Sequence, residues 1–273
     1  MTIALKGTLV IVGAGKMGGA LLEGWLKGGA APSRIVAFDP APPPEVQALI
    51  ARHGIRLNPE ARTIADAEVI VVAVKPQLME EALPTIVPMG RARPLILSVA
   101  AGKTIASFER HFGSDAAVIR TIPNTTAAVG RGITAMARNA HVSDAQMKLA
   151  ETLLAAVGEV VEVENEGLID AATAVSGSGP AYVFYLTECL AAAGEKAGLP
   201  AALAMKLARA TVSGAGELMR ASGIEAATLR QNVTSPKGTT YAALQVLMAE
   251  NGMAPLFEKA VAAAAARSRE LAN

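Results

Sequence analysis

The segment Leu9-Val10-Ile11-Val12-Gly13-Ala14-Gly15-Lys16-Met17-Gly18-Gly19-Ala20-Leu21-Leu22 decides how this chain folds. An apolar, β-branched run leads into glycines spaced G-x-G-x-x-G, and an apolar stretch of helical character follows. Glycines at these positions allow a tight turn, close approach of the backbone to a pyrophosphate, and close packing of the helix. The helix N-terminus would add N–H donors and the positive end of its dipole. The pattern predicts a strand, turn and helix that bind a dinucleotide.

Further β-branched or apolar runs predict a sheet that continues this unit. They cover residues 8–12, 34–38, 69–73, 95–99 and 117–121, and segments of helical length or turn character separate them, as repeated βαβ units require. Two more β-like runs, 132–137 and 157–163, flank a helical stretch that Ser143 and Asp144 can cap. We expect an α/β fold with a Rossmann-type, doubly wound parallel sheet that these two runs extend.

The β-like runs stop near Asn165, and Ala/Leu-rich helical sequence punctuated by glycine and proline follows. We therefore expect residues 1–165 to form a dinucleotide-binding domain and residues 166–273 an all-α helical domain. Pro40 to Pro44 predicts a rigid turn after the second strand. The abundant alanine of the last hundred residues lets helices approach closely, either in one subunit's core or in a helical dimer interface.

Composition narrows the class of protein. In 273 residues, 25 Lys and Arg balance 24 Asp and Glu, so no net field attracts nucleic acid or an anionic membrane. The single cysteine, Cys189, cannot form an intrachain disulfide, and no Cys/His cluster has zinc-ligand spacing. The sequence shows no signal peptide and no apolar run of about 20 residues that would span a membrane. We expect a cytoplasmic protein without metal, nucleic-acid or membrane partners.

Other candidate cofactor residues follow the predicted strands, at the carboxyl edge where ligands of such sheets sit. Asp39 ends the second strand, where an acid would accept from ribose hydroxyls and favour NAD. Arg34 and Arg56 would instead favour a 2′-phosphate, so NADH and NADPH both stay open. Val74-Lys75-Pro76 follows the third strand, which ends at Ala73, and Ser98-Val99-Ala100-Ala101-Gly102 follows the fourth. Lys75 either faces phosphate or ribose or is a solvated turn residue.

A second constellation lies in the helical half. Ala172-Thr173-Ala174-Val175-Ser176-Gly177-Ser178-Gly179-Pro180-Ala181-Tyr182 places glycines and serines before a proline suited to a helix's first turn. Asn232-Val233-Thr234-Ser235-Pro236-Lys237-Gly238-Thr239-Thr240 opens another helix, with free N–H groups and hydroxyls that could cradle a carboxylate. Each segment can alternatively be a helix-capping turn without a ligand.

With these residues the chain resembles the pyrroline-5-carboxylate reductase family over nearly its whole length. The shared motifs are the glycine loop with Met17, Val74-Lys75-Pro76, Pro123-Asn124-Thr125, 176–182 and 234–240. The resemblance implies a Rossmann domain and a helical domain that pairs subunits into homodimers, often in larger rings. It also implies reduction of 1-pyrroline-5-carboxylate to L-proline, the last step of proline biosynthesis, with NADPH or NADH.

The chain departs from this family at two positions, where Lys237 replaces the usual glycine and Thr126 the usual proline. Lys237 either adds charge beside a substrate carboxylate or points into solvent. Its Cβ disfavours any positive φ that glycine would have allowed.

An imine substrate fits the residues at hand. Hydride addition to a ketone needs a proton donor, whereas addition to a protonated imine neutralises a cation, so positioning and one hydrogen bond at nitrogen suffice. We expect the substrate carboxylate on the N–H groups of Gly238, Thr239 and Thr240, helped by the hydroxyls of Ser235 and Thr240. Thr173 would reach the ring nitrogen. The expected cofactor residues are Gly13, Gly15, Lys16, Met17, Gly18, Asp39, Arg56, Ala73, Val74, Lys75, Pro76, Ala100, Gly102 and Asn124.

Two other functions remain as alternatives to imine reduction, and the sequence has a feature that bears on each. β-Hydroxyacid dehydrogenases share the domain order, but they carry a catalytic lysine shortly after a similar Gly-Ser-Gly turn, where this chain has Val183. A non-catalytic dinucleotide-binding protein would keep the fold alone. The hydroxyls at 235–240 count against it, since such a protein needs no carboxylate cradle.

Overall fold

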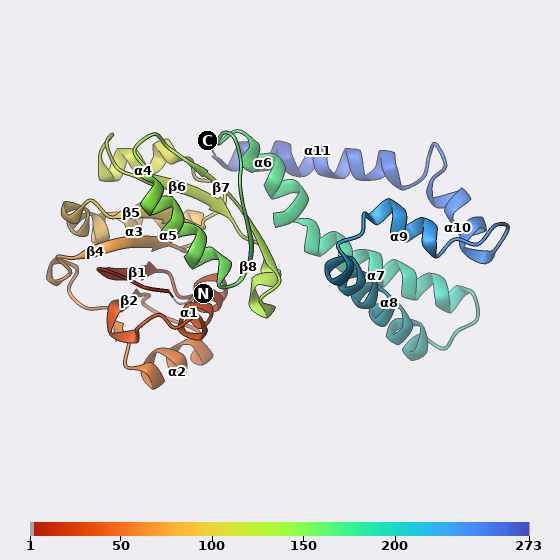
Figure 1. Cartoon of the computed structure of the whole chain (residues 1–273), viewed down its shortest axis with the longest axis horizontal. Coiled ribbons are helices and arrows are strands. Elements are labelled where there is room, and N and C mark those ends of the chain that lie inside the picture. The colour runs from red at the N-terminus through yellow and green to blue at the C-terminus, as the bar shows by residue number, and fades with distance from the viewer. Residues whose placement is uncertain (1–2, 273) are drawn as a thin grey trace. The chain divides into compact units, whose positions relative to one another are not determined.

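The computed structural model of the chain describes residues 3–272. Two compact units make up the chain: one runs through Gly177 and resumes at Ala264, and the other is Ser178–Ala263. The first contains a sheet with strand order β3-β2-β1-β4-β5-β6-β7-β8 (Figure 1). The strands are β1 (Thr8–Val12), β2 (Ile35–Phe38), β3 (Arg56–Leu57), β4 (Ala67–Val72), β5 (Leu95–Ser98), β6 (Val118–Ile122), β7 (Gly132–Arg138) and β8 (Gly158–Glu162).

The order of the strands reverses at β1. β2 and β4 both pair with β1 in parallel, and β5 and β6 continue the parallel order on the β4 side. In such sheets ligands bind beyond the carboxyl ends of the strands at the point of reversal. The glycine loop directly follows β1, so the topology puts it at this point.

The predicted sheet is confirmed with small shifts at the strand ends. β1 matches its prediction residue for residue, and the two late runs do extend the sheet. β7 is antiparallel to β6, whereas β8 is parallel to β7. The edge strand β3 was not predicted, because two residues beginning with an exposed arginine give no periodic signal.

Helices cover both faces of the sheet. Along β1, Leu9 and Ile11 join a core with α1, α2 and α5, while Val10 and Val12 join a second core with α3 and α4. Strands buried on both faces therefore read as continuous apolar runs, as the sequence showed. These helices are α1 (Lys16–Lys27), α2 (Pro44–His53), α3 (Met79–Ile86), α4 (Ile105–Phe112) and α5 (Asp144–Ala155).

Side-chain hydrogen bonds hold α1 and α5 in place. The fully buried Trp25 in α1 donates from Nε1 to the carbonyl of Leu153 in α5 at 2.9 Å. The expected cap of α5 is confirmed as a capping box: Ser143 accepts from the N–H of Gln146, whose side chain accepts from the N–H of Ser143. α1 begins at the glycine loop, so its packing also fixes that loop.

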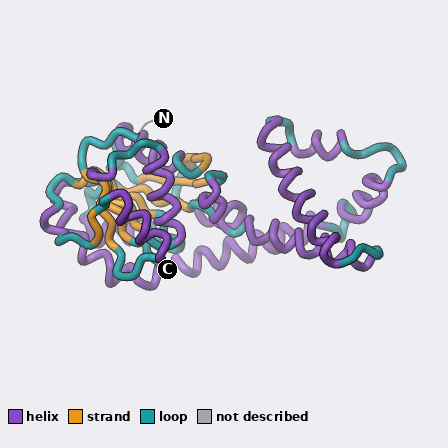
Figure 2. The backbone as a smooth tube through the Cα atoms, turned by 90° about the horizontal axis from the view of Figure 1, so that it is seen from below, coloured by secondary structure: helices purple, strands orange, loops and turns teal. Residues whose placement is uncertain are grey.

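Helices make up the rest of the chain, as expected, and strands (orange) occur only in the first unit of the part that the structure describes (Figure 2). The predicted domain boundary near Asn165 stays a prediction: the last strand ends at Glu162, whereas the packing divides after Gly177. The helices are α6 (Leu168–Ala172), α7 (Gly179–Lys196), α8 (Ala201–Ser222), α9 (Ala226–Asn232), α10 (Thr239–Leu247) and α11 (Met253–Ala272), and a π-helical turn, Thr173–Gly177, follows α6.

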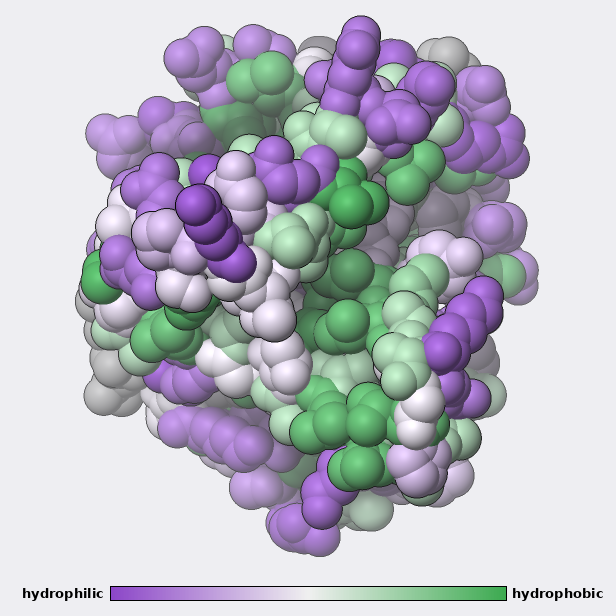
Figure 3. Space-filling model, turned by 90° about the vertical axis from the view of Figure 1, so that its right-hand side faces the viewer, coloured by the Kyte–Doolittle hydropathy of each residue, from purple (hydrophilic) through white to green (hydrophobic). Residues whose placement is uncertain are grey.

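The second unit has almost no apolar core of its own. Its buried apolar residues are three alanines, Ala191, Ala204 and Ala208, while large apolar side chains such as Phe184 and Val246 are 61% and 71% exposed. Figure 3 shows hydrophobic side chains (green) gathered on the face seen from the right-hand side of Figure 1. A surface this apolar is typical of an interface with another protein chain.

α7 packs on α8, where Gly194 leaves room for close approach: a Cβ added there would lie 3.4 Å from Cβ of Ala204. The pKa of the Tyr185 phenol in α7 is raised by its hydrogen bond with the Cys189 thiol one turn later. None of the helices in the described part of the chain is long and apolar enough to cross a membrane.

Candidate active site

Each of the three glycines of the loop is explained by a different feature of the local geometry. Gly13 has φ +94°, and an added Cβ would lie 2.7 Å from the carbonyl carbon and oxygen of Ala73. A Cβ on Gly18 would lie 2.1 Å from the carbonyl oxygen of Gly13. At Gly15 nothing lies within 4 Å of the added atom. Gly13 and Gly18 therefore close the turn, and Gly15 leaves open space for a ligand.

The first turn of α1 can bind an anion. Gly15 is its N-cap, and no side chain caps the turn. Its backbone N–H groups, from Lys16 onwards, are thus available to phosphate oxygens, with the helix dipole adding to the attraction. Lys16 is exposed, whereas Met17 packs partly on the core. The residues present fit a dinucleotide pyrophosphate.

Asp39 is tied to the glycine loop. Its Oδ2 accepts from the N–H of Ala14 at 2.7 Å and its Oδ1 from the N–H of Ala41 at 2.8 Å. Asn58, at φ +51°, holds the Asp39 backbone from the other side: its Oδ1 accepts from the Asp39 N–H at 2.9 Å, and its Nδ2 donates to the Asp39 carbonyl at 2.8 Å. Sequence reasoning missed Asn58, which β3 brings beside β2.

The other predicted cofactor segments lie at the same carboxyl edge. Residues 73–76 follow β4 and touch the glycine loop through Ala73, and residues 100–102 follow β5. Gly102 has φ +69°, and an added Cβ would lie 3.1 Å from the carbonyl of Leu271, so the end of α11 packs on this loop. Arg56 is exposed on β3, opposite Val36 in register.

Asn124 connects the end of β6 to the π-helical turn. Its Nδ2 donates to the carbonyl of Ser176 at 3.1 Å, and its Oδ1 accepts from the N–H of Ile133 at 3.2 Å. The hydroxyl of Thr126, where the family usually has proline, lies 2.7 Å from Asn124 Oδ1 and 2.8 Å from the carbonyl of Arg131. Its single proton can serve only one of them at a time.

The π-helical turn carries two candidate hydroxyls. Thr173 Oγ1 donates to the carbonyl of Ile169 at 2.7 Å, and Ser176 Oγ donates to the carbonyl of Ala172 at 2.8 Å. Because each proton is already used, the free lone pairs of both oxygens can only accept. π-Helical turns are rare and frequently mark functional sites.

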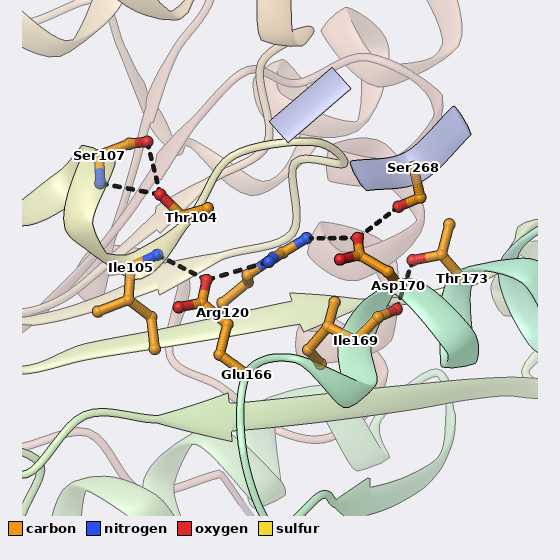
Figure 4. Close-up of polar contacts among 9 residues, drawn as sticks. All are labelled: Thr104, Ile105, Ser107, Arg120, Glu166, Ile169, Asp170, Thr173 and Ser268. Atoms are coloured by element: carbon orange, nitrogen blue, oxygen red, sulfur yellow. Dashed lines mark hydrogen bonds and ion pairs between the residues drawn. The ribbon is translucent and has the colours of Figure 1, made fainter. Parts of the chain in front are cut away.

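A charge cluster lies next to this turn (Figure 4). We call it the Arg120 cluster, and it consists of Arg120, Glu166, Asp170 and Ser268. Arg120 on β6 is 3% exposed and donates to Glu166 Oε1 at 3.0 Å and to Asp170 Oδ1 at 3.3 Å. Ser268 of α11 donates to the same Asp170 oxygen at 2.6 Å. Sequence reasoning missed all four residues. The arginine inside a buried strand was the available signal, because a buried cation needs partners.

The predicted carboxylate cradle belongs to the second unit. Gly238 is the N-cap of α10, and no side chain caps that helix. An added Cβ on Gly238 would lie 2.4 Å from Ser235 Oγ, so a larger residue there would displace this hydroxyl. The N–H of Gly238 already donates to the carbonyl of Ser235 at 3.1 Å. Lys237 does take a positive φ, +58°, despite its Cβ.

Other cavities lie away from these residues. One of about 300 Å³ is lined by Arg93, Phe112, Asp115 and His141 at the amino ends of β5 and β6, the edge opposite the glycine loop. Within residues 3–272, no three His, Cys, Asp or Glu side chains gather as they would around a metal ion.

Known proteins resemble this chain from end to end. A family model described as "Pyrroline-5-carboxylate reductase dimerisation" matches residues 166–271, and one described as "NADP oxidoreductase coenzyme F420-dependent" matches residues 8–102. A pyrroline-5-carboxylate reductase from Pseudomonas aeruginosa is 42% identical over 97% of both chains. The chain belongs to the pyrroline-5-carboxylate reductase family.

Solved structures agree with this membership. A pyrroline-5-carboxylate reductase from Coxiella burnetii has 32% identity and a TM-score of 0.91, covering 98% of this chain and 100% of its own. A pyrroline carboxylate reductase from Plasmodium falciparum, solved with NADP bound, has 28% identity and a TM-score of 0.81, covering 98% and 99%.

The family, the activity and the fold implied by the sequence motifs are therefore confirmed: pyrroline-5-carboxylate reductases reduce 1-pyrroline-5-carboxylate to proline. The matched dimerisation region also makes the chain a homodimer, in keeping with the apolar surface of the second unit. The roles of individual site residues stay predictions.

Proposed function

We propose that this pyrroline-5-carboxylate reductase binds NADP(H) through the glycine loop and holds the substrate through Thr173 and the loop of residues 235–240. The observation that carries the proposal is an uncapped helix N-terminus in each unit: that of α1 follows a glycine that leaves open space, and that of α10 stands beside hydroxyls. The first suits a pyrophosphate and the second a carboxylate.

Gly13, Gly15, Lys16, Met17 and Gly18 would hold the pyrophosphate on α1. Asp39 and Arg56 would border the adenosine ribose, and Ala73, Val74, Lys75, Pro76, Ala100, Gly102 and Asn124 would border the rest of the cofactor. The bound cofactor supplies a hydride. Both NADPH and NADH fit this reading, since Asp39 favours ribose hydroxyls and Arg56 a 2′-phosphate.

In the second unit, the free N–H groups of Thr239 and Thr240 and the hydroxyls of Ser235 and Thr240 would hold the substrate carboxylate. Gly238 keeps the turn in shape, because its own N–H bonds to Ser235. Thr173 Oγ1 would accept from the protonated ring nitrogen, since its proton is used on Ile169. Charge-assisted hydrogen bonds of this kind fix the ring and its reacting carbon.

We further propose the functional division at Asn165, with residues 1–165 serving the cofactor and 166–273 the substrate and dimerisation. The dimerisation model begins at residue 166, which supports it. A cytoplasmic location and a ring of dimers complete the proposal. The lone cysteine fits a reducing compartment, and the mass of the purified protein by light scattering tests the ring.

Single substitutions test the carboxylate cradle. Ser235→Ala and Thr240→Ala each remove one hydroxyl, and each should raise KM for the imine about tenfold, as expected for a hydrogen bond to a charged group. KM for the cofactor should stay the same. The matched control is Thr234→Val, because that hydroxyl donates to the carbonyl of Arg230 in the preceding helix, α9. An unchanged imine KM in both alanine variants would refute the cradle.

A further inference from the structure

The Arg120 cluster carries excess negative charge that the proposed mechanism does not use. It contains one cation, Arg120, and two carboxylates, Glu166 and Asp170. The side chain of Arg120 is 4% exposed and that of Asp170 11%. The side chain of Glu166 is 30% exposed. Formal charges of plus one and minus two leave a net minus one, and around Asp170 little water screens it, so the charge acts over a longer distance than in water.

Groups on the surrounding elements offset this charge only in part. The N–H of Ile105, at the start of α4, donates to Glu166 at 2.8 Å and brings the positive end of a helix dipole, about half a charge. Lys103 is paired with Glu80. Ser268 of α11 and the β-sheet register partners Ser98 and Ala137 are uncharged, and Arg267, next to Ser268, is paired with Glu270. Among residues 3–272, Arg120 is the cation within ion-pair distance of Asp170.

The cluster stands close to the group proposed to meet the imine. Asp170 and Thr173 are three residues apart, which puts their Cβ atoms about 5–6 Å apart on a helix, and Figure 4 draws Thr173 beside Asp170. Hydride addition to a neutral imine would leave an anion on nitrogen, so the imine must be protonated. The proposed substrate groups are hydroxyls and backbone N–H groups, which are too weak as acids to supply that proton.

We propose that the Arg120 cluster keeps the bound imine protonated through its net negative charge, in place of a proton-donating side chain. This inference rests on the proposed contact between Thr173 and the ring nitrogen. Glu166 and Asp170 do not touch the substrate. Their carboxylate charges act on the protonated imine through space. A nearby negative charge favours the protonated form of a base.

The pH dependence of a single turnover at saturating imine tests this inference, because that rate reports protonation in the bound state. Asp170→Asn and Glu166→Gln each remove one negative charge and keep the shape of the side chain. In each variant the alkaline limb of the rate should move down by about one pH unit. The alkaline limb of kcat/KM, which free imine and free protein set, should stay where it is.

Two control variants separate charge from structure. Glu270→Gln removes an equal charge from an exposed pair with Arg267 on α11, and Ser268→Ala removes a hydrogen bond to Asp170 without changing charge. Neither should move the limb of the single-turnover rate. The inference is overturned if the limb stays fixed in Glu166→Gln, whose side chain is 30% exposed and tolerates the change best, or moves equally in Glu270→Gln.

Failure of the proposed contact gives a different result. If Thr173→Val leaves both the imine KM and the single-turnover rate unchanged, Thr173 does not meet the ring nitrogen. A different outcome would keep the contact and reject the role of the cluster. In that outcome, Thr173→Val raises the imine KM or lowers the single-turnover rate, while the alkaline limb of the rate stays fixed in Glu166→Gln.

Discussion

At the scale of the single residue, Lys237 shows the cost of replacing a glycine. A side chain at positive φ costs about 1–2 kcal/mol, and Lys237 sits at φ +58°. The sequence predicted the conflict between Cβ and a left-handed backbone. The structure places the residue in that conformation, so the loop keeps a glycine-like shape and the chain bears the strain.

Lys237→Gly should therefore stabilise the protein. Relief of strain outweighs the extra flexibility that glycine gives the unfolded chain, which costs about 0.5–1 kcal/mol. The free energy of unfolding should therefore rise by about 0.5–1 kcal/mol, which corresponds to a Tm about 2 °C higher. Lys206→Gly, at an exposed helical position in α8, is the control and should lower Tm. A lower Tm for Lys237→Gly, measured by thermal unfolding at one protein concentration, would show that the loop bears no such strain.

At the scale of the elements, the ends of β1, β2 and β3 meet at the glycine loop. Asn58 fixes the backbone of Asp39, and the Asp39 carboxylate fixes the N–H of Ala14. We expect Asn58→Gly to keep the backbone shape, since glycine accepts positive φ, but to release Asp39.

The expected result of Asn58→Gly is a several-fold rise in KM for the cofactor with little change in KM for the imine. The ratio of the NADPH to the NADH value should change too, because Asp39 borders the ribose. Asn139→Gly is the control. It also replaces an asparagine whose side-chain oxygen accepts from a backbone N–H, that of Val118, but at the amino end of β6, and it should leave both KM values unchanged. Equal effects on cofactor and imine would contradict a local role.

The elements that sequence predicted best are those with local signals. β1 was predicted to the residue, since an apolar run ends at Gly13, and the α5 cap followed from Ser143. β3 and the Arg120 cluster could not be predicted in this way. Their formation depends on contacts between residues far apart in the chain, such as Arg120 with Asp170, which no local pattern encodes.

At the scale of the whole molecule, the helical unit depends on a second copy of the chain. Its buried apolar residues are small alanines, and its large apolar residues are exposed in the single chain. Burial of apolar surface drives folding at about 25 cal/mol per Å², so the unit gains most of that stabilisation only in the homodimer.

Tm of the wild-type protein should consequently rise with protein concentration. A tenfold increase contributes about 1.4 kcal/mol to a dimer, or about 1–2 °C in Tm for two chains of this length that unfold together. Calorimetry over a hundredfold range of concentration measures this. A constant Tm would mean that the helical unit is stable by itself, contrary to its missing core.

As a whole, the molecule reduces an anionic cyclic imine with a nicotinamide cofactor. The most direct measurement follows oxidation of NADPH and of NADH, separately, in the presence of 1-pyrroline-5-carboxylate, with a β-keto acid as the comparison substrate. The account predicts cofactor oxidation and proline formation with the imine and none with the keto acid. No oxidation of either cofactor with the imine would contradict it.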